Sequence, residues 1–339
     1  MRPSLEATLR ERLTRLIGEE LRACEAAIRQ ELGGSPVPLI RDITEYVAFA
    51  GGKRLRPVLV LLSTRLAGGS PDRAARLGCV VELLHTATLI HDDVVDRAPL
   101  RRGRPSANAR WGDDAALLVG DHLYSRCMAL LVGDGDLAVM EALAAAMVSM
   151  TEAEVFQLER KRDGELTEDD YLRIIRQKTA TFMSACCRIG GLVAGPDAAA
   201  VDALASFGED LGIAFQIIDD SLDFDADEAR LGKAIGTDLR EGKRTLPLIA
   251  TLERARPEER ARILEALRGP GQPRRRPAEA DRDVGEIHRL VKIYDGVGYA
   301  VARAAAYAAE ATARLARFPD SEEREVLGLI AEYVVHRDR

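Results

Sequence analysis

An acidic pattern of five residues occurs twice in this chain and limits what it can fold into more than any other feature. The first pentad is residues 92–96 (DDVVD) and the second is residues 219–223 (DDSLD), and each follows an apolar stretch typical of a buried helix. Residues four apart share one face of a helix, so Asp92 and Asp96 would project together, as would Asp219 and Asp223. Two such helices facing one another would form a cation site.

The chemistry of the pentads indicates which cation they would hold. Six carboxylates brought together would repel one another unless cations neutralise them or some are protonated. Oxygen ligands select magnesium, which keeps several waters and is usually completed by substrate phosphates. A single pentad is equally typical of a solvated acidic turn, but the apolar flanks of both copies argue against that interpretation. The pattern therefore predicts a magnesium site for a phosphate-bearing substrate.

The composition favours an all-α fold. Of the 339 residues, 47% are apolar and 4% are aromatic, and β-branched residues rarely alternate with polar ones. We expect a single domain over residues 1–339, with a helical N-terminal extension at about 1–35 and a Pro/Arg-rich, solvated loop at 268–281. The net charge of −7 argues against general nucleic-acid binding, because that needs a basic surface.

Cysteine usage and hydropathy predict the location. The five cysteines are scattered without metal-binding spacing, and their odd number without a secretory signal indicates a reducing cytosol. No apolar run approaches the roughly 18 residues of a membrane span. We therefore expect a soluble cytoplasmic protein that makes at most a peripheral contact with a membrane.

Several helices can be placed from their caps and from glycine and proline. Ser70 is expected to cap a helix that begins at Pro71 and delivers the first pentad at its C-terminal end, followed by a basic loop from Pro99 to Pro105. Thr167 is expected to cap the helix that carries Lys178 and Thr179. The other expected helices cover Asp113–Leu131, Leu137–Arg162, Val201–Asp223 and the chain from about Asp281 onward.

Basic residues accompany the pentads. Lys53 and Arg56, in GGKRLRP, are three residues apart at the expected start of a helix, where they would share a face and where phosphate binds. Arg101 and Arg102, in RRGRP, follow the first pentad closely enough for a loop to fold them back over the acids. Guanidinium groups suit phosphate because they donate two parallel hydrogen bonds. The set is completed by Lys178, Thr179, Gln216, Lys233 and Lys243.

Familiar catalytic motifs are absent. The sequence has no Walker loop, dinucleotide fingerprint, Gly-x-Ser-x-Gly elbow or zinc spacing of His and Cys. One reaction needs only metals, cations and an apolar pocket: the ionisation of an allylic diphosphate, in which the departing diphosphate is stabilised and water is excluded from the carbocation.

The order of the motifs resembles one enzyme family. GGKRLRP, LIHDDVVD, RRGRPSAN, KTA and FQIIDDSLD together look like the trans-isoprenyl (polyprenyl) diphosphate synthase family, from about residue 45 to the C-terminus. The segments LVGDHLY and EVFQL and the final RDR are most similar to the long-chain bacterial branch, the octaprenyl-type synthases that make quinone side chains. The resemblance implies the isoprenoid synthase fold, a single large helical bundle with a deep central cleft, usually as a homodimer.

The resemblance also implies roles for individual residues. Asp92 and Asp96 would hold Mg²⁺ with the allylic diphosphate, and Asp219, supported by Asp223, would hold another ion. The positions that match the isopentenyl diphosphate site are Lys53, Arg56, His85 and Arg102. Those that match the allylic diphosphate site are Arg101, Lys178, Thr179, Gln216, Lys233 and Lys243. The residues expected to matter most for catalysis are Asp92, Asp96, Arg101, Lys178, Asp219 and Lys233.

The predicted reaction adds five-carbon units to an allylic primer, farnesyl or geranylgeranyl diphosphate. The double bond of isopentenyl diphosphate attacks the allylic cation, and the released diphosphate is the family's usual candidate for the base. Ala87 and Thr88 lie five and four residues before the first pentad. In this family an aromatic residue there resembles the short-product enzymes, so these small side chains predict an octaprenyl to decaprenyl product.

Three alternatives remain open at this point. A geranylgeranyl or farnesyl diphosphate synthase would share every motif except the small residues at Ala87 and Thr88. A class I terpene cyclase would share the fold, but its second metal site usually departs from an Asp-rich pentad. A regulatory subunit of a heteromeric synthase would be expected to lose acidic ligands, and this chain keeps both pentads.

Overall fold

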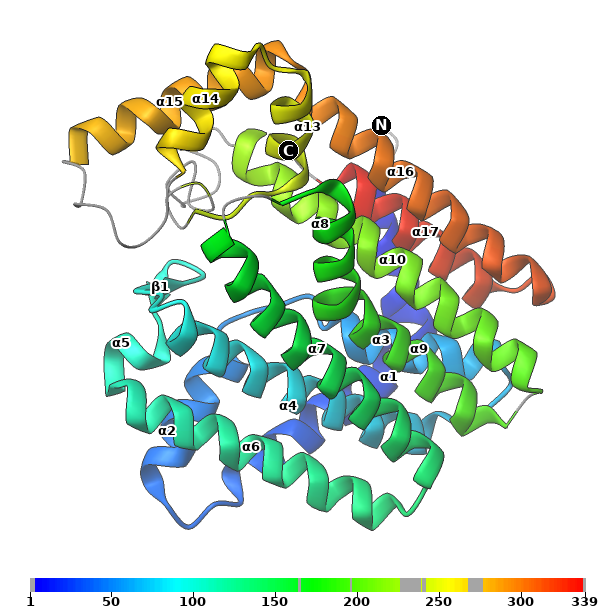
Figure 1. Ribbon diagram of the computed structural model, residues 1–339. Coiled ribbons are helices and arrows are strands. Elements are labelled where there is room, and N and C mark those ends of the chain that lie inside the picture. The colour runs from blue at the N-terminus through cyan, green and yellow to red at the C-terminus, as the bar shows by residue number, and fades with distance from the viewer. Residues whose placement is uncertain are drawn as a thin grey trace. The chain divides into compact units, whose positions relative to one another are not determined.

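The computed structural model confirms the all-α fold class. It describes residues 4–163, 166–195, 197–225, 239, 242–267 and 277–337, and these are almost entirely helical (Figure 1). In this part of the chain the sole sheet is an antiparallel hairpin of β1 (Leu100–Arg101) and β2 (Arg104–Pro105), in which Arg101 pairs with Arg104. The basic loop predicted between Pro99 and Pro105 is therefore a short hairpin.

The chain divides into two compact units, and each is described by itself. Unit 1 consists of residues 1–144, 185–205 and 317–327. Unit 2 consists of residues 145–184, 206–316 and 328–339. That the whole chain forms a single domain stays a prediction.

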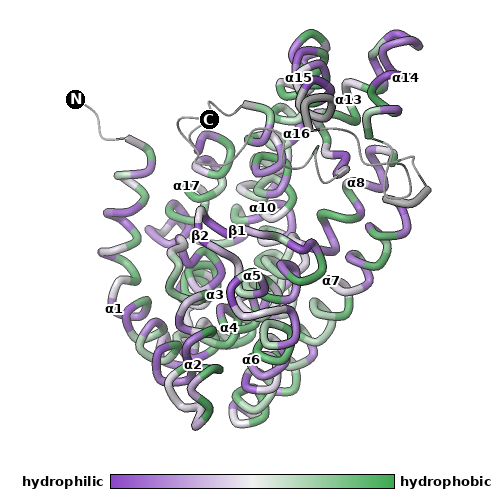
Figure 2. The backbone as a smooth tube through the Cα atoms, turned by 90° about the vertical axis from the view of Figure 1, so that its left-hand side faces the viewer, coloured by the Kyte–Doolittle hydropathy of each residue, from purple (hydrophilic) through white to green (hydrophobic). Residues whose placement is uncertain are grey.

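The helices of unit 1 surround α4 (Pro71–Val95), which carries the first pentad. It packs against α1 (Leu5–Gly33), α3 (Leu55–Leu66) and α6 (Asp113–Asp134), and the shorter α2 (Pro38–Ala48) and α5 (Ala107–Trp111) pack against it as well. Because it has neighbours on most sides, α4 is apolar nearly all round, with residues such as Leu83, Leu84 and Ile90 fully buried. In contrast, hydrophilic and hydrophobic residues alternate along α1 (Figure 2), as expected for a helix with one buried face.

Unit 2 contains the second pentad. Its described elements that lie wholly inside it are α8 (Glu168–Ile175), the π-helical segment η1 (Arg176–Ala180), α13 (Leu246–Arg254), α14 (Pro257–Ala266), α15 (Pro277–Ile293) and α16 (Gly296–Arg314). The unit boundaries fall within or beside α7 (Leu137–Asp163), α9 (Thr181–Ala194), α10 (Ala198–Asp225), η2 (Leu315–Arg317) and α17 (Glu322–His336). A buried cluster that includes Leu248, Ile263, Ile287 and Leu290 joins α13, α14 and α15.

Most predicted helix boundaries are confirmed within a few residues. Thr167 forms a capping box with Asp170, as the sequence indicated for the start of α8. Ser70 does precede α4, but its side chain makes no capping hydrogen bond. Pro71 at the first helical position has no N–H, which leaves fewer backbone donors for a cap to satisfy. The predicted loop at 268–281 lies outside the described residues as far as position 276, and α15 begins at Pro277.

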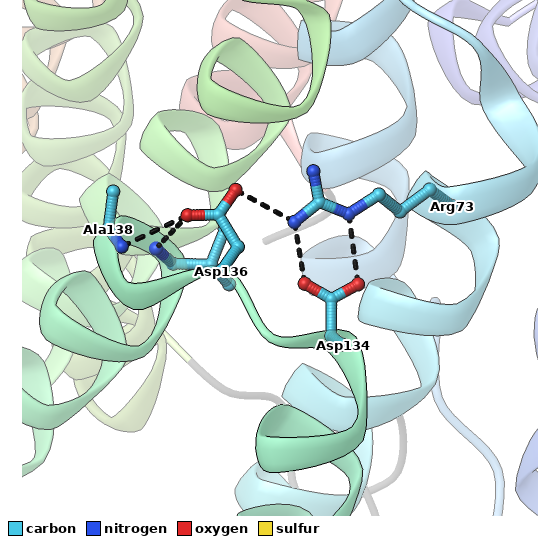
Figure 3. A network of polar contacts seen from close by, with 5 residues as sticks. Arg73, Asp134, Asp136 and Ala138 are labelled. Atoms are coloured by element: carbon cyan, nitrogen blue, oxygen red, sulfur yellow. Dashed lines mark hydrogen bonds and ion pairs between the residues drawn. The ribbon is translucent and has the colours of Figure 1, made fainter.

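A charge network ties the turn between α6 and α7 to the first turn of α4 (Figure 3). Arg73 donates from Nε and Nη2 to the two carboxylate oxygens of Asp134, at 2.9 and 2.5 Å, and from Nη2 to Asp136 at 2.8 Å. Asp136 in turn accepts from the backbone N–H of Ala138 at 3.0 Å. The Arg73 guanidinium holds the pKa of Asp136 below its usual range. The network therefore fixes the direction in which the chain leaves α6.

Candidate active site

The first pentad lies at the C-terminal end of α4, as the sequence predicted. Asp92 is in the last turn, and Asp96 is the C-cap residue, whose N–H donates to the Asp92 carbonyl at 2.8 Å. Because this hydrogen bond is helical, the two residues keep the spacing that places both carboxylates on one face. Asp92 is partly buried and Asp96 is exposed, so this face of the helix end is accessible.

The middle carboxylate of the first pentad has a different role. Asp93 is 1% exposed, and Arg101 donates to it from Nε at 2.7 and 2.8 Å and from Nη2 at 2.7 Å. Burial raises the pKa of Asp93, and the charge of Arg101 opposes that change. The pair thus anchors the hairpin to the end of α4, and it brings Arg101 beside the expected metal ligands, as the sequence predicted.

A group of arginines surrounds His85 in unit 1. Burial, followed by the charges of Arg56, Arg102, Arg101 and Arg54, lowers the pKa of His85 well below its usual value. The imidazole is therefore neutral at neutral pH, when it can both donate and accept a hydrogen bond. Arg56 and Arg102 thus lie near His85, and all three residues were expected to bind isopentenyl diphosphate.

Two buried carboxylates pair with arginines of this region. Arg54 donates to Glu82 at 2.7 Å and to the Ala48 carbonyl at 2.8 Å, and the other buried carboxylate is Asp93. Arg102 lies against Gly52, where an added Cβ would come within 3.1 Å of its Nη1. Gly52 also has a φ of +145°, so the position favours glycine for both space and backbone. Four arginines therefore lie near the two buried carboxylates, and Arg54 also lies 4.0 Å from Glu25.

One prediction for this region is wrong. Lys53 was expected to share a helical face with Arg56, but α3 begins at Leu55, so Lys53 precedes the helix. Its Nζ lies 3.3 Å from Glu6 Oε1, and its side chain is 66% exposed, whereas Arg56 is partly buried and desolvation lowers its pKa. The positive φ angles of Gly51, Gly52 and Arg54 produce this turn. The three-residue spacing between Lys53 and Arg56 therefore does not place their side chains on one face of a helix.

The second pentad lies within α10 and meets the end of the chain. Asp219 is 55% exposed at its side chain and accepts a hydrogen bond from Arg337 Nη2 at 3.1 Å. Arg337 also donates to the Phe215 carbonyl at 3.2 Å and stacks 4.2 Å above the Phe215 ring. Burial lowers the pKa of Arg337. Asp223 follows one turn later on the same face of α10.

The middle carboxylate of the second pentad ends a chain of neutral hydrogen bonds. Asp220 accepts from the Tyr171 hydroxyl at 2.7 Å and from the Gln216 amide at 2.8 Å, and the Gln216 carbonyl oxygen accepts from Thr179 at 2.8 Å. Two residues expected to bind the allylic diphosphate, Thr179 and Gln216, are therefore bonded to one another. A Cβ added at Gly212 would lie 2.5 Å from the Ala180 Cα, so glycine there permits the close approach of α10 and η1.

Lys178 and Thr179 lie in the π-helical turn η1 rather than in a continuous α-helix. The hydroxyl of Thr181 donates to the Arg176 carbonyl, five residues earlier, at 2.9 Å, which satisfies a backbone acceptor within this wider turn. Such turns are frequent at functional sites. Lys178 forms an ion pair with Glu154 of α7, a partner that the sequence did not indicate.

The other residues predicted for the site are two lysines and the two residues expected to set the product length. Lys233 lies outside the described residues. Lys243 is partly buried and lies shortly before α13. Ala87 is 2% exposed in α4, and the Thr88 hydroxyl donates to the His85 carbonyl at 2.8 Å. The chain-length residues therefore lie on the same helix as the first pentad, about one turn before it.

The donor set fits a divalent cation that is completed by its substrate. Within the described residues no three His, Cys, Asp or Glu side chains gather into a preformed metal cage. Each pentad instead offers two carboxylates at helical spacing, as Asp92 and Asp96 do at the end of α4. Magnesium uses one or two carboxylates together with waters and phosphate oxygens. That the two pentads face one another stays a prediction.

Sequence reasoning missed several partners that define this site. Glu154 pairs with the predicted residue Lys178, Tyr171 donates to Asp220 of the second pentad, and Glu82 accepts from Arg54 beside the predicted Arg56. No local pattern distinguishes these residues from ordinary helical ones. His91, beside the first pentad, packs on α6, with Nε2 3.1 Å from the Leu117 carbonyl, so it joins two helices.

Comparisons with known proteins agree with this geometry. Residues 37–281 match the protein family described as polyprenyl synthetase. The chain is 37% identical over 331 residues to octaprenyl diphosphate synthase of Escherichia coli (strain K12), covering 97% of this chain and 99% of that protein. A polyprenyl synthase of Caulobacter crescentus CB15, solved with calcium and isoprenyl diphosphate, has a TM-score of 0.90 at 37% identity and 99% coverage of both chains. A decaprenyl diphosphate synthase of Rhodobacter capsulatus has a TM-score of 0.89 at 39% identity, covering 97% of this chain and 99% of its own.

Proposed function

The chain belongs to the polyprenyl synthetase family, and from this premise we propose how its residues carry out prenyl transfer. It is a trans-prenyltransferase that makes long-chain polyprenyl diphosphates from isopentenyl diphosphate and an allylic diphosphate, with a divalent metal. We propose a product of octaprenyl to decaprenyl length, destined for quinone side chains. The observation that supports the site assignment best is the group of four arginines around His85, one of which, Arg101, is bound to Asp93 of the first pentad.

The arginine group of unit 1 is proposed to bind isopentenyl diphosphate. Arg56 and Arg102 supply guanidinium groups for the two phosphates, and neutral His85 supplies a hydrogen-bond donor. Glu82 keeps Arg54 turned away from the ligand by accepting its hydrogen bond. Exposed Lys53 is proposed to join the site when substrate draws it away from Glu6.

The allylic diphosphate is proposed to bind through cations held by the carboxylates of the pentads. Asp92, Asp96, Asp219 and Asp223 would hold Mg²⁺, which supplies Lewis-acid stabilisation of the departing diphosphate. Arg101 is held beside Asp92 by Asp93 and adds a second source of positive charge. In the second pentad, Gln216 and Thr179 are held by Asp220, and Lys178, Lys233 and Lys243 complete this proposed subsite.

The proposed site residues would favour carbocation formation by stabilising the leaving diphosphate. Cations fixed in place before reaction stabilise the charge that develops on the leaving diphosphate. His85 is neutral but lies among arginines, and the His91 ring beside the first pentad lies 3.1 Å from the Leu117 carbonyl of α6. We therefore propose that the released diphosphate takes the proton after the double bond of isopentenyl diphosphate has attacked.

Product length is proposed to depend on Ala87 and Thr88. Both lie on α4 before the first pentad, and neither has a bulky side chain. An elongating chain that grows away from the metals along α4 would meet no ring at this turn. This supports a long product over the farnesyl or geranylgeranyl alternative.

We also propose that the protein is a homodimer. One described helix, α6, is long and apolar enough to cross a membrane by length and composition alone, and a third of that window is buried. It packs on α4 and α5 while exposing Leu117, Leu118 and Val132. A second copy of the chain covering this face would remove that apolar surface from water.

All five cysteines are free and buried, which supports the proposed cytoplasmic location.

The test is a product analysis. Purified protein is incubated with magnesium, labelled isopentenyl diphosphate and farnesyl diphosphate, and the dephosphorylated products are separated by length. Linear products of about eight to ten units are expected from the open turn at Ala87. A stop at three or four units would contradict the assigned length, and no incorporation with any primer would indicate that this chain needs a partner subunit.

A further inference from the structure

Positive charge is concentrated in one short stretch of an acidic protein. Residues 97–112 contain five arginines and no acidic residue, although the chain as a whole has a net charge of −7. This stretch comprises the β1–β2 hairpin and α5, which follow the end of α4 (Figure 1). The proposed site accounts for Arg101 and Arg102 alone.

The five arginines of this stretch have two different environments. Arg101 is bound to Asp93, and Arg102 lies against Gly52. Arg97, Arg104 and Arg110 are instead exposed, and no ion pair joins any of these three to a carboxylate in the described part of the chain. Three cations without a carboxylate partner on an acidic protein call for an anionic partner outside the chain.

Two of these arginines are held by aromatic rings. Arg104 lies 4.2 Å from the centroid of Tyr46, and Arg110 lies 4.8 Å from Tyr46 and 4.4 Å from Trp111. The two rings meet edge to face at 5.0 Å, and the Tyr46 hydroxyl donates to the Pro105 carbonyl at 2.8 Å. The guanidinium groups are therefore held in fixed positions before any ligand arrives.

Exposed apolar side chains accompany this cluster in the sequence. Val95 is 57% exposed and Leu100 is 60% exposed. Arginine with tryptophan, tyrosine and exposed aliphatic residues is the composition of proteins at a membrane–water interface, because each side chain has an apolar body and a polar end. A binding surface for nucleic acid or a small phosphate would have no use for exposed Val95 and Leu100.

We propose that Tyr46, Arg97, Arg104, Arg110 and Trp111, the arginine–tryptophan surface, dock the protein on a membrane that carries anionic phospholipids. Val95 and Leu100 insert among the headgroups beside it. The inference rests on the proposed function, since a polyprenyl diphosphate of long chain length must pass from this enzyme to a lipid phase. Docking itself needs no turnover, so it can be tested without substrate.

The chain's single tryptophan makes the test specific, because Trp111 belongs to the proposed surface. Its fluorescence is recorded while the protein is titrated with vesicles of phosphatidylglycerol and phosphatidylcholine, or of phosphatidylcholine alone. The anionic vesicles are expected to shift the emission to the blue and to carry the protein on flotation, and salt should weaken both effects. Neutral vesicles should do neither.

The matched variants remove two charges each. Arg104→Gln with Arg110→Gln should weaken binding to the anionic vesicles by roughly tenfold or more. Arg10→Gln with Arg22→Gln makes the same change in charge on exposed residues of α1 and should bind as the unchanged protein does. Circular dichroism and product formation in detergent show that each variant is folded and active, which separates a failure of docking from a failure of the proposed function.

Four results would overturn the proposal. They are no flotation with anionic vesicles, equal binding to neutral ones, equal losses in the two double variants, and the same emission shift on adding inorganic diphosphate or RNA, when Arg104→Gln with Arg110→Gln abolishes that shift. The last result would assign the surface to a free phosphate compound or a nucleic acid.

Discussion

The two pentads share a sequence pattern but are built into the protein differently. In the first, the middle carboxylate Asp93 is buried and bound by the guanidinium group of Arg101. In the second, Asp220 is partly buried and bound by two neutral donors, Tyr171 and Gln216. The outer carboxylates keep their helical spacing in both. The difference teaches that the repeated pattern sets where the outer carboxylates, the proposed metal ligands, point, while the middle carboxylate holds neighbouring side chains in place.

The residues before each pentad also differ. Ala87 and Thr88 precede the first pentad by five and four residues, and the same places before the second hold Ala214 and Phe215. Phe215 lies beneath Arg337, whose guanidinium group reaches Asp219. A ring is therefore present before the second pentad at a position where the first has a small side chain.

The largest expected effect comes from removing an outer carboxylate. Asp92→Ala and Asp219→Ala should each lower kcat by about a thousandfold, because each deletes a proposed ligand of the ion that stabilises the leaving diphosphate. Steady-state kinetics and calorimetric titration with Mg²⁺ measure the loss. Asp320→Ala, at a side chain that is 99% exposed, is the control and should keep full activity. Unchanged kinetics in Asp92→Ala would contradict the assignment.

The next comparison tests the small residue before the first pentad. Ala87→Phe should shorten the product, because a ring one turn before the metal ligands would block the elongating chain. Radiochromatography of the dephosphorylated products measures the distribution, and the series Ala87→Val, Ala87→Leu and Ala87→Phe should shorten it progressively. An unchanged distribution in a folded, active Ala87→Phe variant would rule out this role.

The two middle carboxylates should respond differently when a donor is removed. Arg101→Met leaves Asp93 buried without its ion-pair partner and should cost about 3 kcal/mol of unfolding free energy. Tyr171→Phe removes one neutral hydrogen bond to Asp220 and should cost about 1 kcal/mol. Urea denaturation measures both. Adding Asp93→Asn should restore part of the first loss, because it removes the buried charge.

The pH dependence of Arg101→Met follows from the raised pKa of Asp93. In the folded variant the carboxyl group holds its proton to a higher pH than in the unfolded chain, so stability falls as pH rises through the folded-state value. The loss should therefore be smaller at pH 5 than at pH 8. A loss that does not change with pH, or no rescue by Asp93→Asn, would show that Asp93 is not a buried charge.

Arg337 gives a smaller effect that is confined to the second pentad. Arg337→Met keeps an apolar side chain against Phe215 but removes the cation that competes with a metal for Asp219. Mg²⁺ affinity should rise by a few fold, equivalent to about 1 kcal/mol. Calorimetric titration of the metal alone measures it. Weaker binding of Mg²⁺ would mean that Arg337 orients Asp219 instead of competing for it.

The smallest effect on activity lies far from either pentad and serves as a reference. Arg73→Met should cost about 1 to 2 kcal/mol of unfolding free energy and leave kcat unchanged, because Arg73 joins Asp134 and Asp136 at a helix junction. The pKa of Asp136 is lowered in the folded state, so its contribution is present above the ordinary value of 3.8 and is lost as pH falls below it. The difference in unfolding free energy between Arg73→Met and the unchanged protein should therefore become smaller as the pH falls. A changed kcat would show that this junction affects the site.

The fold and the candidate site were predictable to different degrees. Helix positions followed from local signals such as the capping box at Thr167. The placement of Asp92 and Asp96 on one helical face followed from their four-residue spacing. The spacing argument failed for Lys53, because two glycines with positive φ angles place it before the helix. The π-helical turn at Lys178 was also not predictable, since it has no distinctive local sequence.

By itself, the sequence determined the helical class, the paired outer carboxylates and the set of basic residues, because these depend on composition and on a helical period that acts over a few residues. Tertiary structure decided which groups those residues meet. Arg337 reaches Asp219 across 118 residues of sequence, and Tyr171 reaches Asp220 across 49. Such partners are chosen by the packing of distant helices, and it is burial on packing that makes the Asp93 carboxylate need the guanidinium group of Arg101.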